Sequence, residues 1–501
     1  MGQHVAEAES KIGSSTFRAD SEPARLAISV WPAAKRLWSP AQGCSVLEFA
    51  ALLYLTLPLV LFFSLFTKLW IAAPAQLAIL AVLLRVRPRT TGPQAPVQRL
   101  SWRHWLTCAV LAVLFLWVCG YVRPFGHTFD WLKHFAVINE LGQHPWPPTN
   151  EEAGTFLRYS LGYYLVPGLL TAVLENRWIE LFVLLQTWTG LVLLLALLLQ
   201  KIRPVRTTVF LVLFLLFSGL DLVGWLIHEG NTSLLVHKEW WAGSNYAFAY
   251  DGHATLFIWV PQHALAGMLG IALLLLNGKQ SAPPQAIGLL GAAVLFWSPF
   301  AALGLMPFAL AAAVRGGRSA FLDGGNILCA TVLGIPLLGY LTAGSASVPH
   351  GFSWNHPGFS IISCVEFLIL EVGLYLLALR LCGWEHLRHS AIVIAMLLVL
   401  PLYRIGAFND FTMRACIPAL MLVGIAAAAA MTEVRSLRCI PLAVLMLVGS
   451  ITSVLEIIGR SRDGTVPARS QTLRSGVLAQ PPYVMQYNAP LPNWVLRDRS
   501  R

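Results

Sequence analysis

The chain has 501 residues, of which 56% are hydrophobic and only 12% are charged, and its mean hydropathy is +0.65. Soluble domains carry about 25% charged residues, so this composition excludes an ordinary soluble protein and indicates a chain that crosses a membrane many times. In such a protein a net charge of +11 reports Lys and Arg held on the cytoplasmic side rather than an affinity for nucleic acid.

The first 43 residues are polar and lack the basic, apolar and small-residue pattern of a cleaved signal peptide. We expect them to form a cytoplasmic segment with an interfacial amphipathic helix at 25–38. Every cysteine lies inside or beside an apolar run, and no two form a C-x-x-C pair. We therefore expect buried thiols rather than disulfides or metal ligands.

Apolar runs long enough for membrane spans occupy most of the remaining chain. They lie near 44–65, 70–86, 104–122, 178–200, 207–227, 254–276, 326–343, 359–381, 390–405, 413–431 and 439–458, with less regular runs at 156–174 and 285–314. The prediction is an all-α polytopic bundle of about 11–13 spans. It forms one transmembrane domain over 44–458, followed by an extracytoplasmic extended tail over 459–501.

The charge of the connectors orients the bundle. The basic connectors are assigned to the cytoplasm; they are 84–104, 201–206, 315–318, 385–389 and 433–438. Because 84–104 and 201–206 then lie on the same side, the stretch 155–177 must begin and end outside. We expect dipping or interfacial helices there, bent at Gly162, Pro167 and Gly168. The same parity makes 285–314 a broken hairpin with Pro299 near its tip.

The first outer segment, 126–147, carries the most suggestive polar residues. Asp130, Lys133 and His134 share one helical face, while Trp131, Phe135 and Ile138 form an apolar face. This pattern predicts a helix lying on the membrane surface, and Asp130 could accept a proton from an incoming hydroxyl group. A solvated helix whose charges have no function is the alternative interpretation.

Further polar clusters face the same compartment. Aromatic, carboxylate and imidazole groups of the kind that bind sugars or lipid headgroups are concentrated over 228–263, without zinc-like spacing. At 403–420 an arginine next to a carboxylate is suited to grip a phosphate or to form a structural ion pair. The residues in these and the neighbouring outer segments are Arg158, Tyr163, Asp221, His237, Glu239, Trp240, Asp251, His253, His263, Arg404, Asp410 and Arg414.

The segments FDWLKHFAVINEL (129–141), HPWPP (144–148) and RYSLGYYLVPGLL (158–170) resemble the first outer loop of the GT-C class of polytopic glycosyltransferases. The stretches FSGLDLVG (217–224), KEWWAG (238–243), WVPQH (259–263) and FNDFTMR (408–414) are similar to bacterial polytopic proteins associated with that class. The resemblance covers most of 100–420 and implies a GT-C-like fold in a bacterial inner membrane, with the active face outward.

What the resemblance implies about the site is specific. Asp130 matches the position of the catalytic carboxylate and would act as general base with inversion at the anomeric carbon. Arg414, with Arg404 and Lys133, would bind the phosphate of a polyprenyl-phosphate-linked sugar. The remaining residues of the site would contact the sugar or a glycan or lipid acceptor; they are His134, Arg158, Tyr163, Asp221, His237, Glu239, Trp240, Asp251, His253, His263 and Asp410.

No resident cofactor is expected, and the paired-acid motif that would support a divalent metal is missing, since Thr128 and Leu132 stand two residues before and after Asp130. The other functions considered are a transporter or flippase of a lipid-linked or phosphorylated substrate, and an O-antigen polymerase or ligase. A transporter would be expected to carry charged residues buried in the middle of its spans.

Overall fold

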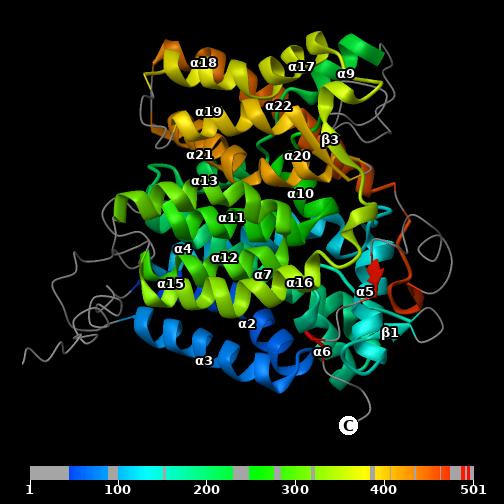
Figure 1. Ribbon diagram of the computed structural model, residues 1–501. Helices are drawn as coiled ribbons and strands as arrows, with labels where there is room; N and C mark the ends of the chain where they lie inside the picture. Colours follow the sequence, from blue (N-terminus) through cyan, green and yellow to red (C-terminus); the bar gives the residue numbers. More distant parts are fainter. Residues whose placement is uncertain are drawn as a thin grey trace, which may run out of the picture.

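The computed structural model describes a chain that is mostly helical (Figure 1). The expected helix at 25–38 lies outside the described residues. These are 44–88, 100–150, 154–229, 248–275, 284–316, 322–383, 390–406, 408–433, 436–462, 464–473, 487–490 and 494–496.

The helices run side by side across Figure 1. The α-helices are α2 (Val46–Leu65), α3 (Leu69–Val86), α4 (Trp102–Leu116), α5 (Trp131–Gln143), α6 (Leu165–Leu174), α7 (Ile179–Ile202), α8 (Thr207–Leu215), α9 (Asp221–Glu229), α10 (His253–Trp259), α11 (Pro261–Leu275), α12 (Ile287–Trp297), α13 (Pro299–Gly316), α15 (Gly324–Cys329), α16 (Ile335–Leu341), α17 (Ile361–Leu368), α18 (Leu374–Leu381), α19 (Ser390–Val399), α20 (Asp410–Ala415), α21 (Ile417–Glu433) and α22 (Ile440–Arg460).

Seven helices among the described residues are long and apolar enough to cross a membrane. Shorter apolar helices accompany them, so the predicted all-α membrane bundle is confirmed while the count of 11–13 spans stays a prediction. The seven are Val46–Leu65, Leu69–Val86, Trp102–Tyr121, Asn176–Ile202, Gly324–Leu341, Ile361–Leu381 and Leu437–Arg460.

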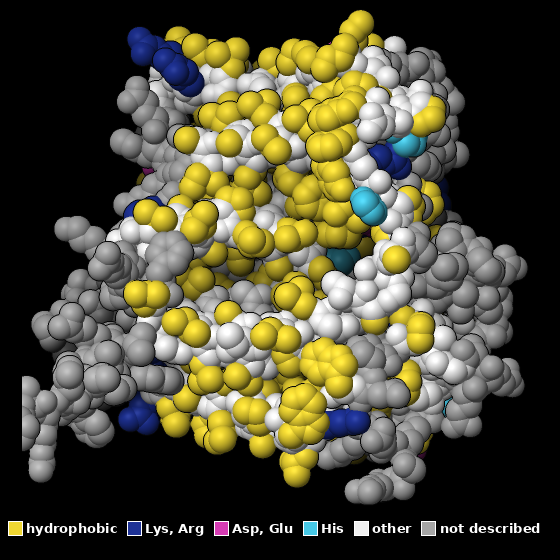
Figure 2. Space-filling view, in the orientation of Figure 1, with side chains coloured by type: hydrophobic (Ala, Val, Ile, Leu, Met, Phe, Trp, Pro, Cys, Tyr) yellow, Lys and Arg dark blue, Asp and Glu magenta, His cyan; other side chains and the backbone are white. Residues whose placement is uncertain are grey.

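The surface of the bundle suits a lipid environment. Figure 2 shows hydrophobic side chains covering the middle of one face, with Lys and Arg toward its margins. Leu77, Met306 and Leu447 are 67%, 60% and 68% exposed. So much exposed apolar surface would be unfavourable in water, whereas hydrocarbon tails solvate it well.

The predicted break in 285–314 is present. Helix α12 ends at Trp297, Ser298 has an extended backbone conformation, and Pro299 begins α13. Proline has no N–H to donate and is well accommodated at the start of a helix. The two helices pack against each other, as expected for a hairpin, and the break lies one residue before the predicted tip.

One end of the bundle holds buried ion pairs. Lys201 Nζ lies 2.7 Å from Glu48 Oε1, and Arg85 Nη2 lies 2.7 Å from Asp323 Oδ2. Cys44 N donates to Val86 O at 3.1 Å. The chain therefore brings the ends of connectors 84–104 and 201–206 to the same end of the molecule, as the parity argument requires.

The other end gathers α5, α6, short strands and the tail, on the right of Figure 1. One sheet has the order β1–β2–β5, and a second pairs β3 with β4, both antiparallel. The strands are β1 (Thr149–Asn150), β2 (Thr155–Leu157), β3 (His350–Phe352), β4 (Tyr403–Ile405) and β5 (Asn488–Ala489).

The C-terminal tail connects several parts of this end. Asn139 Nδ2 donates to Ala468 O at 2.7 Å, and Arg469 Nη2 donates to Arg177 O at 3.2 Å. Arg158 N donates to Tyr487 O at 2.6 Å. The stretch 155–177 therefore meets the tail near both of its ends, and its one α-helix, α6, has only 10 residues.

Candidate functional site

Helix α5 is packed into the protein on nearly all sides. Trp131, Phe135 and Ile138 are buried as predicted, but Val137 and Asn139 on other faces are buried as well. The helix packs against α6 and contacts the tail. The predicted polar face is only partly open, because His134 is buried against Tyr164 and Trp259 while Asp130 and Lys133 remain partly exposed.

His134 is fixed in this packing. Its Nε2 donates to the Trp259 carbonyl at 2.9 Å, since a carbonyl only accepts. Burial lowers the pKa of His134 to about 3, so the ring is neutral and its Nδ1 accepts from the Tyr164 hydroxyl at 2.7 Å. The Trp259 indole donates to Glu456 Oε2 at 3.2 Å. These contacts tie α5 to α10 and α22, immediately behind Asp130.

Asp130 stands at the start of α5 and binds Lys133 within the first turn. Lys133 Nζ lies 2.5 Å from Asp130 Oδ2, and the two side chains are 17% and 23% exposed. Burial alone would raise the pKa of Asp130, but the charge of Lys133, with its hydrogen bond and a smaller contribution from Arg414, holds the pKa below its ordinary value. Asp130 is therefore an ionised carboxylate restrained by a cation.

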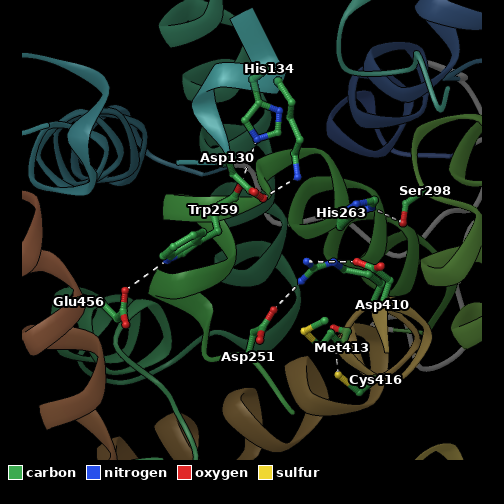
Figure 3. A network of polar contacts seen from close by, with 12 residues as sticks. Asp130, His134, Asp251, Trp259, His263, Ser298, Asp410, Met413, Cys416 and Glu456 are labelled. Carbon is green, nitrogen blue, oxygen red and sulfur yellow. Dashed lines mark hydrogen bonds and ion pairs between the residues drawn. The ribbon is translucent and has the colours of Figure 1, made fainter. Parts of the chain in front are cut away.

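Arg414 reaches the same space from α20. Its Nη1 donates to Asp251 Oδ2 at 2.5 Å, and its Nη2 lies 3.9 Å from Asp410 Oδ1. Arg414 Nε is buried and has no hydrogen-bond acceptor among the described residues. Figure 3 shows Asp130, Asp251 and Asp410 converging on this space from different segments. Arg414, within electrostatic reach of Asp130, thus keeps one buried donor without an acceptor among the described residues.

The close approach of two helices positions Arg414. Gly304 on α13 lies against the carbonyl of Ala415, the residue after Arg414, and a side chain at position 304 would collide with that carbonyl. At the start of α20, Asn409 adopts a left-handed conformation with φ of 56°, which asparagine tolerates better than most residues. Local backbone requirements therefore place α20 so that Arg414 points inward.

His263 on α11 also faces the site. It lies within electrostatic reach of Arg414 and Lys133, and its Nδ1 is 2.7 Å from the Ser298 hydroxyl. Ser298 is the residue at which the α12–α13 hairpin breaks. The break in the hairpin thus supplies a polar group that orients a histidine of the site (Figure 3).

Tyr159 is a residue of the site that the sequence pattern did not reveal. Its hydroxyl lies within electrostatic reach of Lys133 and Asp130, whereas Tyr163 is buried and bonds the Thr187 hydroxyl at 2.6 Å. The only sequence signal is the group of tyrosines in RYSLGYY. Because this segment is irregular up to Tyr164, helical periodicity could not tell which ring faces the site.

Other predicted site residues lie apart from this group. Asp221 is completely buried, and its Oδ2 accepts from the Ser218 hydroxyl at 3.1 Å. His253 is 1% exposed, and its Nδ1 donates to the Phe214 carbonyl at 2.6 Å. Asp221 thus bonds the segment between α8 and α9, whereas His253 bonds the last turn of α8.

The last predicted residues lie at the strands or outside the described chain. Arg158 follows β2, and its Nη1 donates to the Leu341 carbonyl at 3.4 Å. Arg404 is part of β4 and acts electrostatically on His356. The residues outside the described ranges are His237, Glu239 and Trp240.

Neither a metal cluster nor a relative helps to assign the site. In the part of the chain that the structure describes, no group of three or more His, Cys, Asp or Glu side chains could hold a metal ion. Comparison with family models, curated proteins and solved structures finds no match to this chain. The function must therefore be argued from the geometry of Asp130, Lys133 and Arg414.

Proposed function

We propose that this protein is a membrane glycosyltransferase that transfers a sugar from a polyprenyl-phosphate donor to a glycan or lipid acceptor at the outer face of a bacterial inner membrane. The observation that carries the proposal is the convergence of one carboxylate, Asp130, with two cations, Lys133 and Arg414, although Arg414 comes from a distant segment. A base beside two phosphate-binding groups is what transfer from a phosphate donor needs.

Arg414 and Lys133 would bind the donor phosphate. Arg414 Nε is a buried donor with no acceptor among the described residues, and a phosphate oxygen would satisfy it. The face in Figure 2 is hollowed between α19 and α11, and hydrophobic side chains line the hollow. A polyprenyl chain could occupy such an apolar surface from the side of the bilayer, with its phosphate directed toward α20.

Asp130 would act as the base. The acceptor oxygen attacks the anomeric carbon, the bond from that carbon to the phosphate oxygen breaks, and the hydroxyl proton passes to Asp130. The polyprenyl phosphate leaves with the electron pair, and the configuration inverts. Lys133 restrains Asp130 in the free protein. A bound phosphate would draw Lys133 toward itself and thereby raise the pKa of Asp130, so donor binding would prepare the base.

Asp130→Asn tests the proposal in protein reconstituted in nanodiscs. With a labelled polyprenyl-phosphate hexose as donor, transfer should fall by a factor on the order of 10²–10⁴, while binding of polyprenyl phosphate persists. Glu140→Gln, in the same helix, is the matched control and should keep transfer. Unchanged transfer by Asp130→Asn would exclude the base role.

One observation favours the transporter as a second candidate. Glu371 is buried in the middle of the span Ile361–Leu381, and acidic residues at such depth are typical of ion and proton pathways. In a flippase, movement of a labelled polyprenyl phosphate between leaflets would survive Asp130→Asn and be lost in Glu371→Gln. The glycosyltransferase predicts that transfer is the activity that Asp130→Asn abolishes.

A further inference from the structure

Two acidic side chains meet inside the bundle, away from the candidate site. Glu371 is 1% exposed and lies in a π-helical turn, Ile369–Gly373, that interrupts the span Ile361–Leu381. Asp221 is completely buried and is the first residue of α9. Single π-helical turns are rare and often occur at functional positions. In the sequence the run 359–381 is apolar overall, so Glu371 is inconspicuous there.

The carboxyl groups of Asp221 and Glu371 are within hydrogen-bonding distance of each other. The Ser218 hydroxyl donates to Asp221 Oδ2 at 3.1 Å, but Asp221 Oδ1 receives no hydrogen bond from any donor among the described residues. The Glu371 carboxylate also lies directly against the backbone at Gly219, where a side chain would collide with it. The pair is thus closely packed, with an acceptor oxygen facing another carboxyl group.

A proton bound by the pair would remove the repulsion between the two carboxyl groups. Two ionised carboxylates in contact in an apolar interior repel each other strongly, whereas one shared proton removes the repulsion and supplies the missing donor. We propose that Asp221 and Glu371 form a proton-binding site that holds one proton between the two carboxyl groups. Asp221 begins a nine-residue helix, whose dipole favours a negative charge there, so Asp221 should need the proton only because Glu371 lies against it.

Two described tyrosines near the pair direct their hydroxyl groups to backbone carbonyls. The Tyr375 hydroxyl is directed to the carbonyls of Ser218 and Leu445, both at 2.9 Å, and the Tyr250 hydroxyl donates to the Leu397 carbonyl at 2.5 Å. Cys416 and Cys364 are further described titratable groups in this region. The described groups that act on the Asp221 carboxyl include no cation.

The pair is linked to the candidate site through the segment between α8 and α9. His253 N donates to the Phe217 carbonyl at 2.9 Å, and the Phe217 ring contacts both His253 and Tyr375. His253 follows Asp251, the partner of Arg414, by two residues. Loss of the proton would drive Asp221 away from Glu371 and move this segment. Proton occupancy would therefore change the position of Arg414.

Infrared spectroscopy of the full chain in lipid nanodiscs tests the site, independently of the proposed function. At neutral pH the wild type should show the carbonyl stretch of a protonated carboxylic acid, shifted in D₂O and absent from Glu371→Gln. Glu48→Gln is the matched control, because Glu48 is also buried but lies in an ion pair with Lys201; that variant should keep the band. A wild type without the band, or a Glu371→Gln variant that retains it, would overturn the proposal.

Thermal unfolding provides a second test. Raising the pH removes the shared proton, so the wild type should lose stability on the alkaline side, and Glu371→Gln, which cannot ionise, should lose less. If Glu371→Gln does not fold, Asp221→Asn serves instead and should also reduce the alkaline loss. Identical alkaline loss in the wild type and the folded variant would contradict a shared proton.

Discussion

Arg414 Nη1 donates to Asp251 Oδ2 at 2.5 Å, across 163 residues of sequence, and both side chains are less than 10% exposed. This pair fixes the guanidinium next to Asp130, in a region where a lone charge would be unfavourable. The position of the site's principal cation therefore depends on a carboxylate from a different segment of the chain.

Removing Asp251 should consequently destabilise the protein. Asp251→Ala leaves Arg414 buried without its closest partner, and breaking a buried pair in this way costs about 3–5 kcal/mol. Asp410→Ala is the matched control, because Asp410 is 33% exposed and 3.9 Å from Arg414; we expect less than about 1 kcal/mol. Thermal unfolding in detergent measures the stability of both variants. Equal losses of stability would show that Asp251 stabilises Arg414 no more than Asp410 does.

Lys133 should set the pH range in which Asp130 works. Lys133→Met removes a charge that lowers the pKa of Asp130. The acid limb of the pH profile of kcat/KM should therefore move to higher pH, and carbodiimide labelling of Asp130 should shift in parallel. Lys133→Arg should keep the wild-type profile. If the pH profiles of Lys133→Met and the wild type are the same, Lys133 does not control the pKa of Asp130.

Acid should loosen the tail from the segment 126–147. The His127 ring accepts from Val466 N at 3.3 Å, and burial, with the charges of Arg123 and Arg460, lowers the pKa of His127 from 6.5 to about 4. The folded state disfavours protonated His127, so this stability is complete above pH 6.5 and is lost as the pH falls toward 4. The full loss is about 3 kcal/mol.

The measurement is thermal unfolding over this pH range, together with limited proteolysis of 464–473. His127→Asn keeps an acceptor but cannot be protonated, so its stability should change less with pH than that of the wild type. If the two proteins respond equally to acid, another group is responsible.

Gly304 should be intolerant of a side chain. Gly304→Ala places a methyl group against the Ala415 carbonyl, and overpacking of this kind costs about 1–3 kcal/mol. The variant should also bind polyprenyl phosphate more weakly, because α20 carries Arg414. Gly291→Ala, in the preceding helix, meets nothing within 4 Å and should be neutral or slightly stabilising. Equal behaviour of the two alanine variants would remove the role assigned to Gly304.

The sequence predicted the helical bundle and the break near Pro299, because apolar periodicity and connector charge are local signals. That Asp130, Lys133 and Arg414 act at one site was implied only by the resemblance to the GT-C class. The sequence did not reveal the partnership of Asp251 with Arg414 or the position of Tyr159, since each depends on how distant segments pack. Glu371 escaped notice for a different reason. One acidic residue scarcely changes the mean hydropathy of a long apolar run, and the role proposed for Glu371 depends on its contact with Asp221.

The pairing of β5 with β2 has a consequence for how the protein is made. Strand β5 lies more than three hundred residues after β2, and Asn139 reaches Ala468 across 329 residues. Most of the bundle can be inserted into the membrane during synthesis before these partners exist. The end of the molecule that holds Asp130 is therefore assembled last, and a nascent chain stalled before the tail would expose α5 to proteases.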